Sequence, residues 1–228
     1  MKPKLILIQL LAVIALSLAP MSHGQIVYNN SALTSDLSVR FNPGTNEVGD
    51  EITLAAGGRV LTLFEFQYWG LSFSGDEQAR LRLLSNDGAA SPQGALMPGT
   101  VLFESVWFTI GATPRSTLIF SDFTSPSEAT VPLTSLLPDD FTWSVQFRTL
   151  GVSASAGVDL YNPPITGSSF NDFWFNTGTT WELRTNSLTS DPMNFAARIT
   201  TVPEPTTLWL AILGGVALLG VRLRYSRS

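Results

Sequence analysis

Hydrophobic and polar residues alternate with a period of two along the middle of the chain. Three segments show the pattern most clearly: residues 59–69, 78–84 and 142–150. In the last of these, Trp143, Val145 and Phe147 share one face, and the residues between them are polar. A period of two with one polar face is typical of half-buried antiparallel strands. These segments therefore predict antiparallel β-structure.

Shorter apolar runs, separated by glycine, proline, serine, threonine and asparagine, predict further strands. Their expected positions are residues 26–28, 38–41, 51–54, 101–110, 116–120, 129–133, 170–175, 181–184 and 195–200. The stretch 85–99, rich in glycine and proline, is expected to be a loop. Many short strands at regular spacing favour an all-β fold, a two-sheet antiparallel β-sandwich of the jelly-roll type. We expect residues 25–202 to form this single domain.

The first residues have the three parts of a secretory signal peptide. Lys2 and Lys4 form a positive start, residues 5–19 are apolar, and Ser22-His23-Gly24 places small residues before a cleavage point. The apolar run is short for a membrane span, which needs about 20 residues. We therefore expect signal peptidase to remove residues 1–24, with an uncleaved membrane anchor as the alternative.

A second apolar segment precedes the C-terminus. Residues 206–221 carry no charge and contain three glycines, which membrane helices tolerate. Their length is near the lower limit for a transmembrane helix. The basic residues that follow are Arg222, Arg224 and Arg227. Because positive flanks stay in the cytoplasm, we expect the domain to lie outside the inner membrane.

Pro203-Glu204-Pro205, the short glycine-bearing apolar segment and the basic end follow one another in a recognisable order. Over residues 203–228 the chain resembles the PEP-CTERM sorting signal of Gram-negative, exopolysaccharide-producing bacteria. The resemblance implies that an exosortase, a membrane transpeptidase-like enzyme, recognises the Pro-Glu-Pro residues and removes the apolar segment. It also implies transient membrane anchorage, then delivery to the cell surface or the medium. A plain tail anchor with a proline-rich neck is the alternative.

The residue types missing from 25–202 limit its chemistry. This segment contains no cysteine, lysine or histidine, so it cannot form a Ser-His-Asp or Cys-His nucleophile. It also lacks the usual ligands of zinc, copper and haem sites. Its 17 acidic residues against 8 arginines give a formal charge of −9, and nucleic acid is not an expected partner. Oxygen-liganded calcium and carboxylate acid–base pairs remain.

Carboxylates occur at three places in the predicted domain that could carry chemistry. Asn46, Glu47 and Asp50 are the candidate calcium ligands, although their spacing is not that of an EF-hand. Solvated turn residues are the alternative. Asp139-Asp140 and Asp172 are the candidates for the acid pair of a glycan hydrolase, but no spacing fixes their separation. We predict no catalytic residue and no obligatory cofactor.

Tryptophans are the remaining candidates for ligand contact. Trp143 lies on an apolar face and is expected in the core. The candidates for stacking on sugar rings are Trp69, Trp107, Trp174 and Trp181, with core packing as the alternative. In Phe173-Trp174-Phe175, three consecutive aromatic residues of a strand cannot all point inward. Trp174, with its neighbour Asp172, is therefore the predicted ligand-facing residue.

Two functional classes follow from these observations. The first is a non-enzymatic, exported cell-surface or matrix protein whose sandwich domain binds exopolysaccharide or its neighbours in a biofilm. The second is a secreted, carboxylate-dependent glycan hydrolase. We prefer the first class, because no paired-acid motif supports the second.

Overall fold

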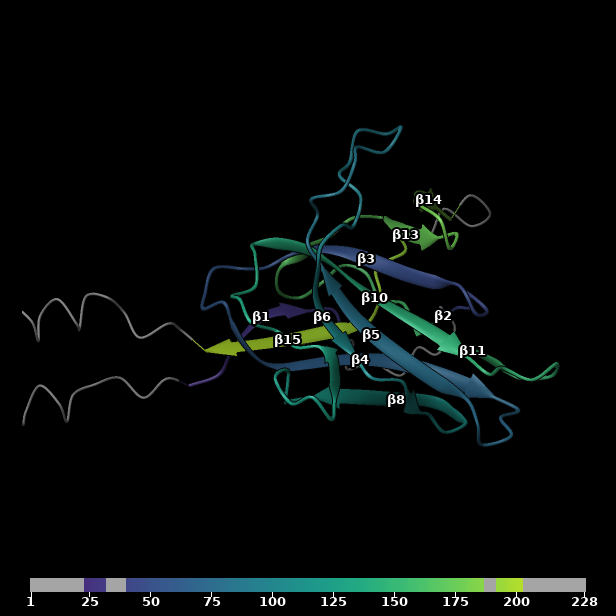
Figure 1. The fold of residues 1–228 in the computed structure, drawn as a ribbon. Helices are drawn as coiled ribbons and strands as arrows, with labels where there is room; N and C mark the ends of the chain where they lie inside the picture. The colour runs from purple at the N-terminus through teal and green to yellow at the C-terminus, as the bar shows by residue number, and fades with distance from the viewer. Residues whose placement is uncertain (1–22, 32–39, 187–191, 203–228) are drawn as a thin grey trace, which may run out of the picture. The chain divides into compact units, whose positions relative to one another are not determined.

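The computed structural model describes residues 23–31, 40–186 and 192–202. Within it, Gly24–Val202 form one compact unit. The described residues contain strands and no helix, and all strand pairs are antiparallel. The strands form two sheets, so the predicted all-β, antiparallel fold is confirmed (Figure 1).

The first sheet has the order β1-β15-β4-β11-β2, and β8 pairs with β4 beside this path. Its strands are β1 (Gln25–Asn29), β2 (Arg40–Phe41), β4 (Val60–Leu71), β8 (Thr113–Phe120), β11 (Ser155–Asp159) and β15 (Ala197–Val202). β15 pairs with the first part of β4 and β11 with the last part. The long strand β4 therefore organises this sheet.

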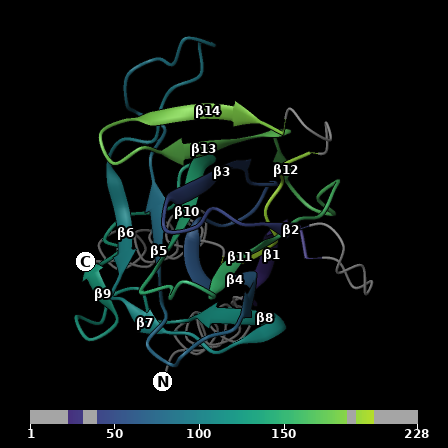
Figure 2. The ribbon, with the colours of Figure 1, turned by 90° about the vertical axis from the view of Figure 1, so that its right-hand side faces the viewer.

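The second sheet has the order β14-β13-β3-β10-β5-β6-β9, with β12 beside β3 and β7 beside β5. Its strands are β3 (Glu47–Thr53), β5 (Gln78–Leu84), β6 (Val101–Ser105), β7 (Phe108–Thr109), β9 (Ala129–Val131), β10 (Asp140–Arg148), β12 (Ser168–Ser169), β13 (Asp172–Asn176) and β14 (Trp181–Thr185). Figure 2 shows β14 and β13 at one side of this sheet and β6 and β9 toward the other.

The two sheets bury one common hydrophobic core. Trp143 on β10 lies against Phe64 and Phe66 on β4, with ring centroids 5.4 and 5.7 Å apart. Phe195, just before β15, lies 5.8 Å from the same indole. All four side chains are fully buried, and such burial stabilises a fold by about 1.5–3 kcal/mol per large side chain. The predicted core position of Trp143 is confirmed.

Several strand boundaries differ from the predictions. β5 has the expected bounds, whereas β3 begins at Glu47 rather than at residue 51. The expected strand 101–110 is divided into β6 and β7, which both pair with β5. Residues 106–107 belong to neither strand, and the pairing of β6 with β9 is irregular between Glu104 and Ser105. β11 and β12 were not predicted, since both are short and rich in serine and glycine.

The side chains at the start of β4 point to the opposite face of the sheet from the one predicted. The period of two over residues 59–69 predicts Val60 on the same face as Phe64, but Val60 is 37% exposed while Leu61 is 8% exposed. Thr200 pairs with Leu63 and Thr201 pairs with Leu61, so a β-bulge lies between them. A bulge adds a residue to one strand and reverses the alternation beyond it, which explains the difference.

Two predicted segments fall at the ends of the chain. The predicted signal peptide, residues 1–24, lies outside the described residues apart from its last two. The predicted transmembrane segment, residues 206–221, lies wholly outside them. In the part of the chain that the structure describes, no helix has the length and apolarity needed to cross a membrane.

Candidate functional site: a polar face of the second sheet

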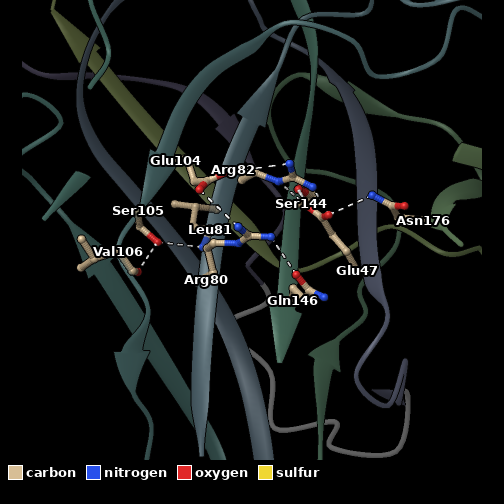
Figure 3. A network of polar contacts seen from close by, with 10 residues as sticks. All are labelled: Glu47, Arg80, Leu81, Arg82, Glu104, Ser105, Val106, Ser144, Gln146 and Asn176. Atoms are coloured by element: carbon tan, nitrogen blue, oxygen red, sulfur yellow. Dashed lines mark hydrogen bonds and ion pairs between the residues drawn. The ribbon is translucent and has the colours of Figure 1, made fainter. Parts of the chain in front are cut away.

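The outer face of the second sheet carries a network of charged and amide side chains. Successive residues of a strand point to opposite faces. The core residues Val48, Leu81 and Val145 point toward the first sheet, so their neighbours along the strands point away from it. Figure 3 shows the outward side chains from β3, β5, β10, β13 and β6 meeting at this face.

Glu47 is at the centre of the network. Its carboxylate accepts hydrogen bonds from Arg82 Nε at 2.6 Å, from Arg82 Nη2, from Ser144 Oγ at 2.6 Å and from Asn176 Nδ2 at 3.1 Å. The residue is only 3% exposed. Charge-assisted, two-pronged contacts of this kind are among the stronger hydrogen bonds in proteins. Four strands are therefore joined through one carboxylate.

A second glutamate completes the charge balance. Arg80 Nη1 lies 3.2 Å from Glu104 Oε1, and Arg82 Nη1 lies 3.8 Å from Glu104 Oε2. Arg80 Nη2 also donates to Gln146 Oε1 at 2.8 Å. Two arginines thus face two glutamates, and the network has no net formal charge.

A hollow of about 290 Å³ opens beside the network. Its lining consists of Glu47, Arg80, Arg82, Gln146 and Asn176 from the sheet, with Thr45, Asn46, Thr177 and Gly178 from two turns. Gly178 has φ +91°, a left-handed conformation suited to glycine, and its N–H donates to Asn176 Oδ1 at 2.8 Å. The turn therefore orients the Asn176 amide at the rim of the hollow. Amide, carboxylate and guanidinium groups together match the donors and acceptors of a hydroxyl-rich ligand.

Trp174 does not lie on the surface, where the sequence analysis placed it. Its side chain is fully buried, and Nε1 donates to Glu51 Oε2 at 3.3 Å. Phe173 is buried on the other face of β13, where its ring lies 4.8 Å from Phe41. Both faces of β13 are covered at this point. Trp174 is therefore not the solvent-facing aromatic residue of this strand that the sequence predicts. Asp172 is half-buried, and burial raises the pKa of its carboxyl.

The predicted calcium ligands do not converge. Glu47 and Asp50 are three residues apart on β3, so their side chains point to opposite faces. Glu47 is paired with Arg82, while Asp50 is fully buried and accepts hydrogen bonds from Ser169 Oγ at 2.6 Å and Phe195 N at 2.8 Å. Asn46 donates to the Pro43 carbonyl. The prediction of a calcium site on these three residues is therefore wrong. No group of three or more histidine, cysteine, aspartate or glutamate side chains that could hold a metal ion occurs in residues 23–31, 40–186 and 192–202.

The remaining carboxylates divide between two environments. Asp139 pairs with Arg59 at 2.6 Å. Asp140 lies near Glu51 instead, since Asn86 Nδ2 donates to Glu51 Oε1 at 3.2 Å and to Asp140 Oδ2 at 3.4 Å. Burial, and then the neighbouring negative charges, raise the pKa of Glu51. The neighbouring residues Asp139 and Asp140 thus have different partners.

The other candidate tryptophans occupy three different positions. Trp69 is buried, with Arg40 5.6 Å from its ring. Trp107 is half-buried and carries the guanidinium groups of Arg80 and Arg148 at 4.7 and 4.1 Å from the ring centre. Trp181 is half-buried on the edge strand β14, directly paired with Asn176. Trp107 and Trp181 are therefore the candidates that border the polar face.

Sequence reasoning missed six residues of the polar network: Arg80, Arg82, Glu104, Ser144, Gln146 and Asn176. A signal was present, because polar residues alternate with the core residues on both β5 and β10. That signal places the residues on an outer face, but it does not give the register that joins the strands.

The predicted sorting residues, Pro203, Glu204 and Pro205, and the basic residues Arg222, Arg224 and Arg227, lie outside the described residues. The last described strand, β15, ends at Val202, and its Thr201 pairs with Gln25. Residues 201–227 match the PEP-CTERM protein-sorting motif. No curated protein and no solved structure matches the chain. The chain therefore carries a PEP-CTERM protein-sorting motif at its C-terminus.

Proposed function

We propose that this chain is an exported protein that an exosortase delivers to the cell surface or the extracellular matrix. The observation that carries the proposal is the PEP-CTERM motif over residues 201–227. Because β15 ends at Val202, Pro203-Glu204-Pro205 follows the last described strand directly in the sequence. Signal peptidase and exosortase are the partners during export.

The domain between the two ends acts as a binding module without catalytic activity. Two sheets around one core support a β-sandwich with the jelly-roll-like shape expected from the sequence. The hollow beside Glu47 supplies fixed amide, carboxylate and guanidinium groups, which suit the hydroxyl groups of a polysaccharide. We infer that the ligand is a polysaccharide of the surrounding matrix.

The substitution Glu204→Ala tests the sorting step. We expect the variant to stay at full length in the inner membrane, while the unmodified chain is processed and leaves it. Glu128→Ala, an exposed glutamate of the domain, is the matched control and should be processed normally. Fractionation and immunoblotting measure both. Release of the Glu204→Ala variant at the rate of the unmodified chain would contradict the proposal.

Incubation of the protein with the exopolysaccharide of its host tests the absence of catalysis. We expect saturable binding with no new reducing ends over many hours. Accumulation of reducing ends that stops in an Asp140→Asn or an Asp172→Asn variant would instead favour the glycan hydrolase.

A further inference from the structure

We propose that the polar face binds an uncharged glycan chain that lies across the strands of the second sheet, over a row of side chains from β14 to β5. This inference rests on the proposed polysaccharide-binding function and names the class of ligand, its path and its contacts. The row consists of Trp181, Asn176, Glu47, Gln146 and Arg80. The buried Glu47 holds its neighbours in place, and the other four side chains offer the contacts.

The strand register places these side chains in line. Trp181 pairs with Asn176, and Asn176 pairs with Glu47. Gln146 pairs with Arg80, and it follows Val145, which pairs with Val48, so it lies opposite Glu47. Directly paired residues point to the same face. The row therefore crosses five neighbouring strands on one face, a distance of about 19 Å at ~4.8 Å per strand.

The middle of the row is held in place before any ligand arrives. Asn176 donates to Glu47 at 3.1 Å, and Arg80 donates to Gln146 at 2.8 Å. Gln146 Nε2 also donates to the Thr45 carbonyl at 3.2 Å. Side chains that are already fixed lose little rotamer freedom on binding, which favours affinity. Figure 3 shows Asn176, Glu47, Gln146 and Arg80 directed toward one another across the strands.

Aromatic rings stand at both ends of the row. Trp181 is on the edge strand and half-buried, next to the hollow-lining residues Asn176 and Gly178. At the other end, the half-buried Trp107 ring is held 4.7 Å from the guanidinium carbon of Arg80. An indole offers a broad apolar surface with a polar edge, suited to the apolar face of a sugar ring. The hollow is lined by Asn176, which pairs with Trp181, and by Arg80, which contacts Trp107.

The charges on and around the row select against an anionic glycan. Arg80 and Arg82 each lie within ion-pair distance of Glu47 or Glu104, so these four charges balance. Arg148, beside the Trp107 ring, adds one positive charge at the edge of the row. The segment 25–202 has a formal charge of −9, which repels a polyanion at low salt. A neutral glycan needs no surplus positive charge on the protein, and the negative charge of the domain does not repel it.

Binding of defined glycans to the full chain, purified in detergent, tests the inference. The probes are the neutral oligosaccharides cellohexaose, mannohexaose and isomaltohexaose, the anionic chain polygalacturonate, and the exopolysaccharide of the host. We expect at least one neutral probe to bind with an affinity that is unchanged between 50 and 500 mM salt, and polygalacturonate not to bind. Calorimetry or glycan-array fluorescence gives the dissociation constants.

Two substitutions test the row itself. Trp181→Ala should weaken binding at least about 10-fold, as expected for the loss of an aromatic contact with the ligand. Thr45→Arg adds bulk at the exposed rim of the hollow and should also weaken it. Phe170→Ala, which removes an aromatic ring that is 54% exposed outside the row, is the matched control and should bind normally. Thermal unfolding shows whether each variant is folded.

The outcomes separate this inference from the proposed function. If the host polysaccharide binds but neither substitution changes the affinity, the row is wrong while polysaccharide binding stands. Binding of polygalacturonate that is lost at high salt overturns the preference for a neutral chain. If no glycan binds, including the host polysaccharide, both the inference and the proposed binding function are overturned.

Discussion

Replacement of Glu47 by glutamine removes one charge from the centre of the polar network. The amide has the size of the carboxylate, but it turns one acceptor oxygen into an NH2 donor that faces the Arg82 guanidinium. Arg82 is then left with Glu104, 3.8 Å away, as its nearest carboxylate among the described residues. Removing one partner of a buried ion pair costs about 3–5 kcal/mol. Since the Arg82 side chain keeps 16% exposure and Glu104 remains close, we expect a loss near the lower end, about 3 kcal/mol.

Urea unfolding of residues 24–202, followed by tryptophan fluorescence, measures the free energy of unfolding. With a slope of about 2 kcal/mol per molar urea, the midpoint should fall by roughly 1.5 M. Glu182→Gln is the matched control, because Glu182 and Arg184 form a 2.6 Å pair whose side chains are 47% and 41% exposed. Exposed pairs contribute about 0–1 kcal/mol, so this midpoint should hardly move.

A double variant tests the physical reason for the loss. Glu47→Gln combined with Arg82→Gln removes the uncompensated charge, so it should be less destabilised than the sum of the single changes by about 1–3 kcal/mol. Strict additivity would show that the two side chains are not coupled. Equal losses below about 1 kcal/mol for Glu47→Gln and Glu182→Gln would refute the reasoning.

Three further substitutions give separate tests by the same unfolding assay. Burial raises the pKa of Asp50, so the folded state holds this proton more tightly, and stability is lost as pH rises from about 4 toward the raised pKa. The free energy of unfolding of Asp50→Asn should therefore rise relative to that of the unmodified chain from pH 4 to 7. A difference between the two free energies that does not change with pH would contradict this. Trp143→Ala should cost about 3–5 kcal/mol, and a loss under about 1 kcal/mol would argue against the common core. Gly157→Ala should lower the free energy of unfolding by about 1–3 kcal/mol, because the added Cβ would lie 1.9 Å from the Phe41 carbonyl oxygen. In the control Gly151→Ala the added Cβ meets nothing within 4 Å, so the free energy of unfolding should not change.

The strands could be predicted because their signal is local. Trp143, Val145 and Phe147 alternate with polar residues whatever the rest of the chain does, and β10 and β5 were found at nearly their observed positions. The reversal at Val60 could not be predicted, since it depends on a bulge in the pairing with β15, about 140 residues away. Such a bulge leaves no mark in the β4 sequence itself.

The candidate site was harder to predict than the fold, because its residues meet only through long-range pairing. Glu47, Arg82 and Ser144 come from three strands, and their approach depends on the register of β3, β10 and β5. The burial of Trp174 likewise depends on what covers β13 from both sides. By contrast, the sorting motif is a contiguous signal, so the sequence sufficed to identify it.

Intact-mass spectrometry of the protein recovered from the cell surface or medium of its host is the most direct test of export and sorting. We expect a species that begins at Gln25 and lacks the apolar segment 206–221, as removal by signal peptidase and exosortase predicts. A recovered species that still extends from Met1 or through Ser228 would contradict that processing.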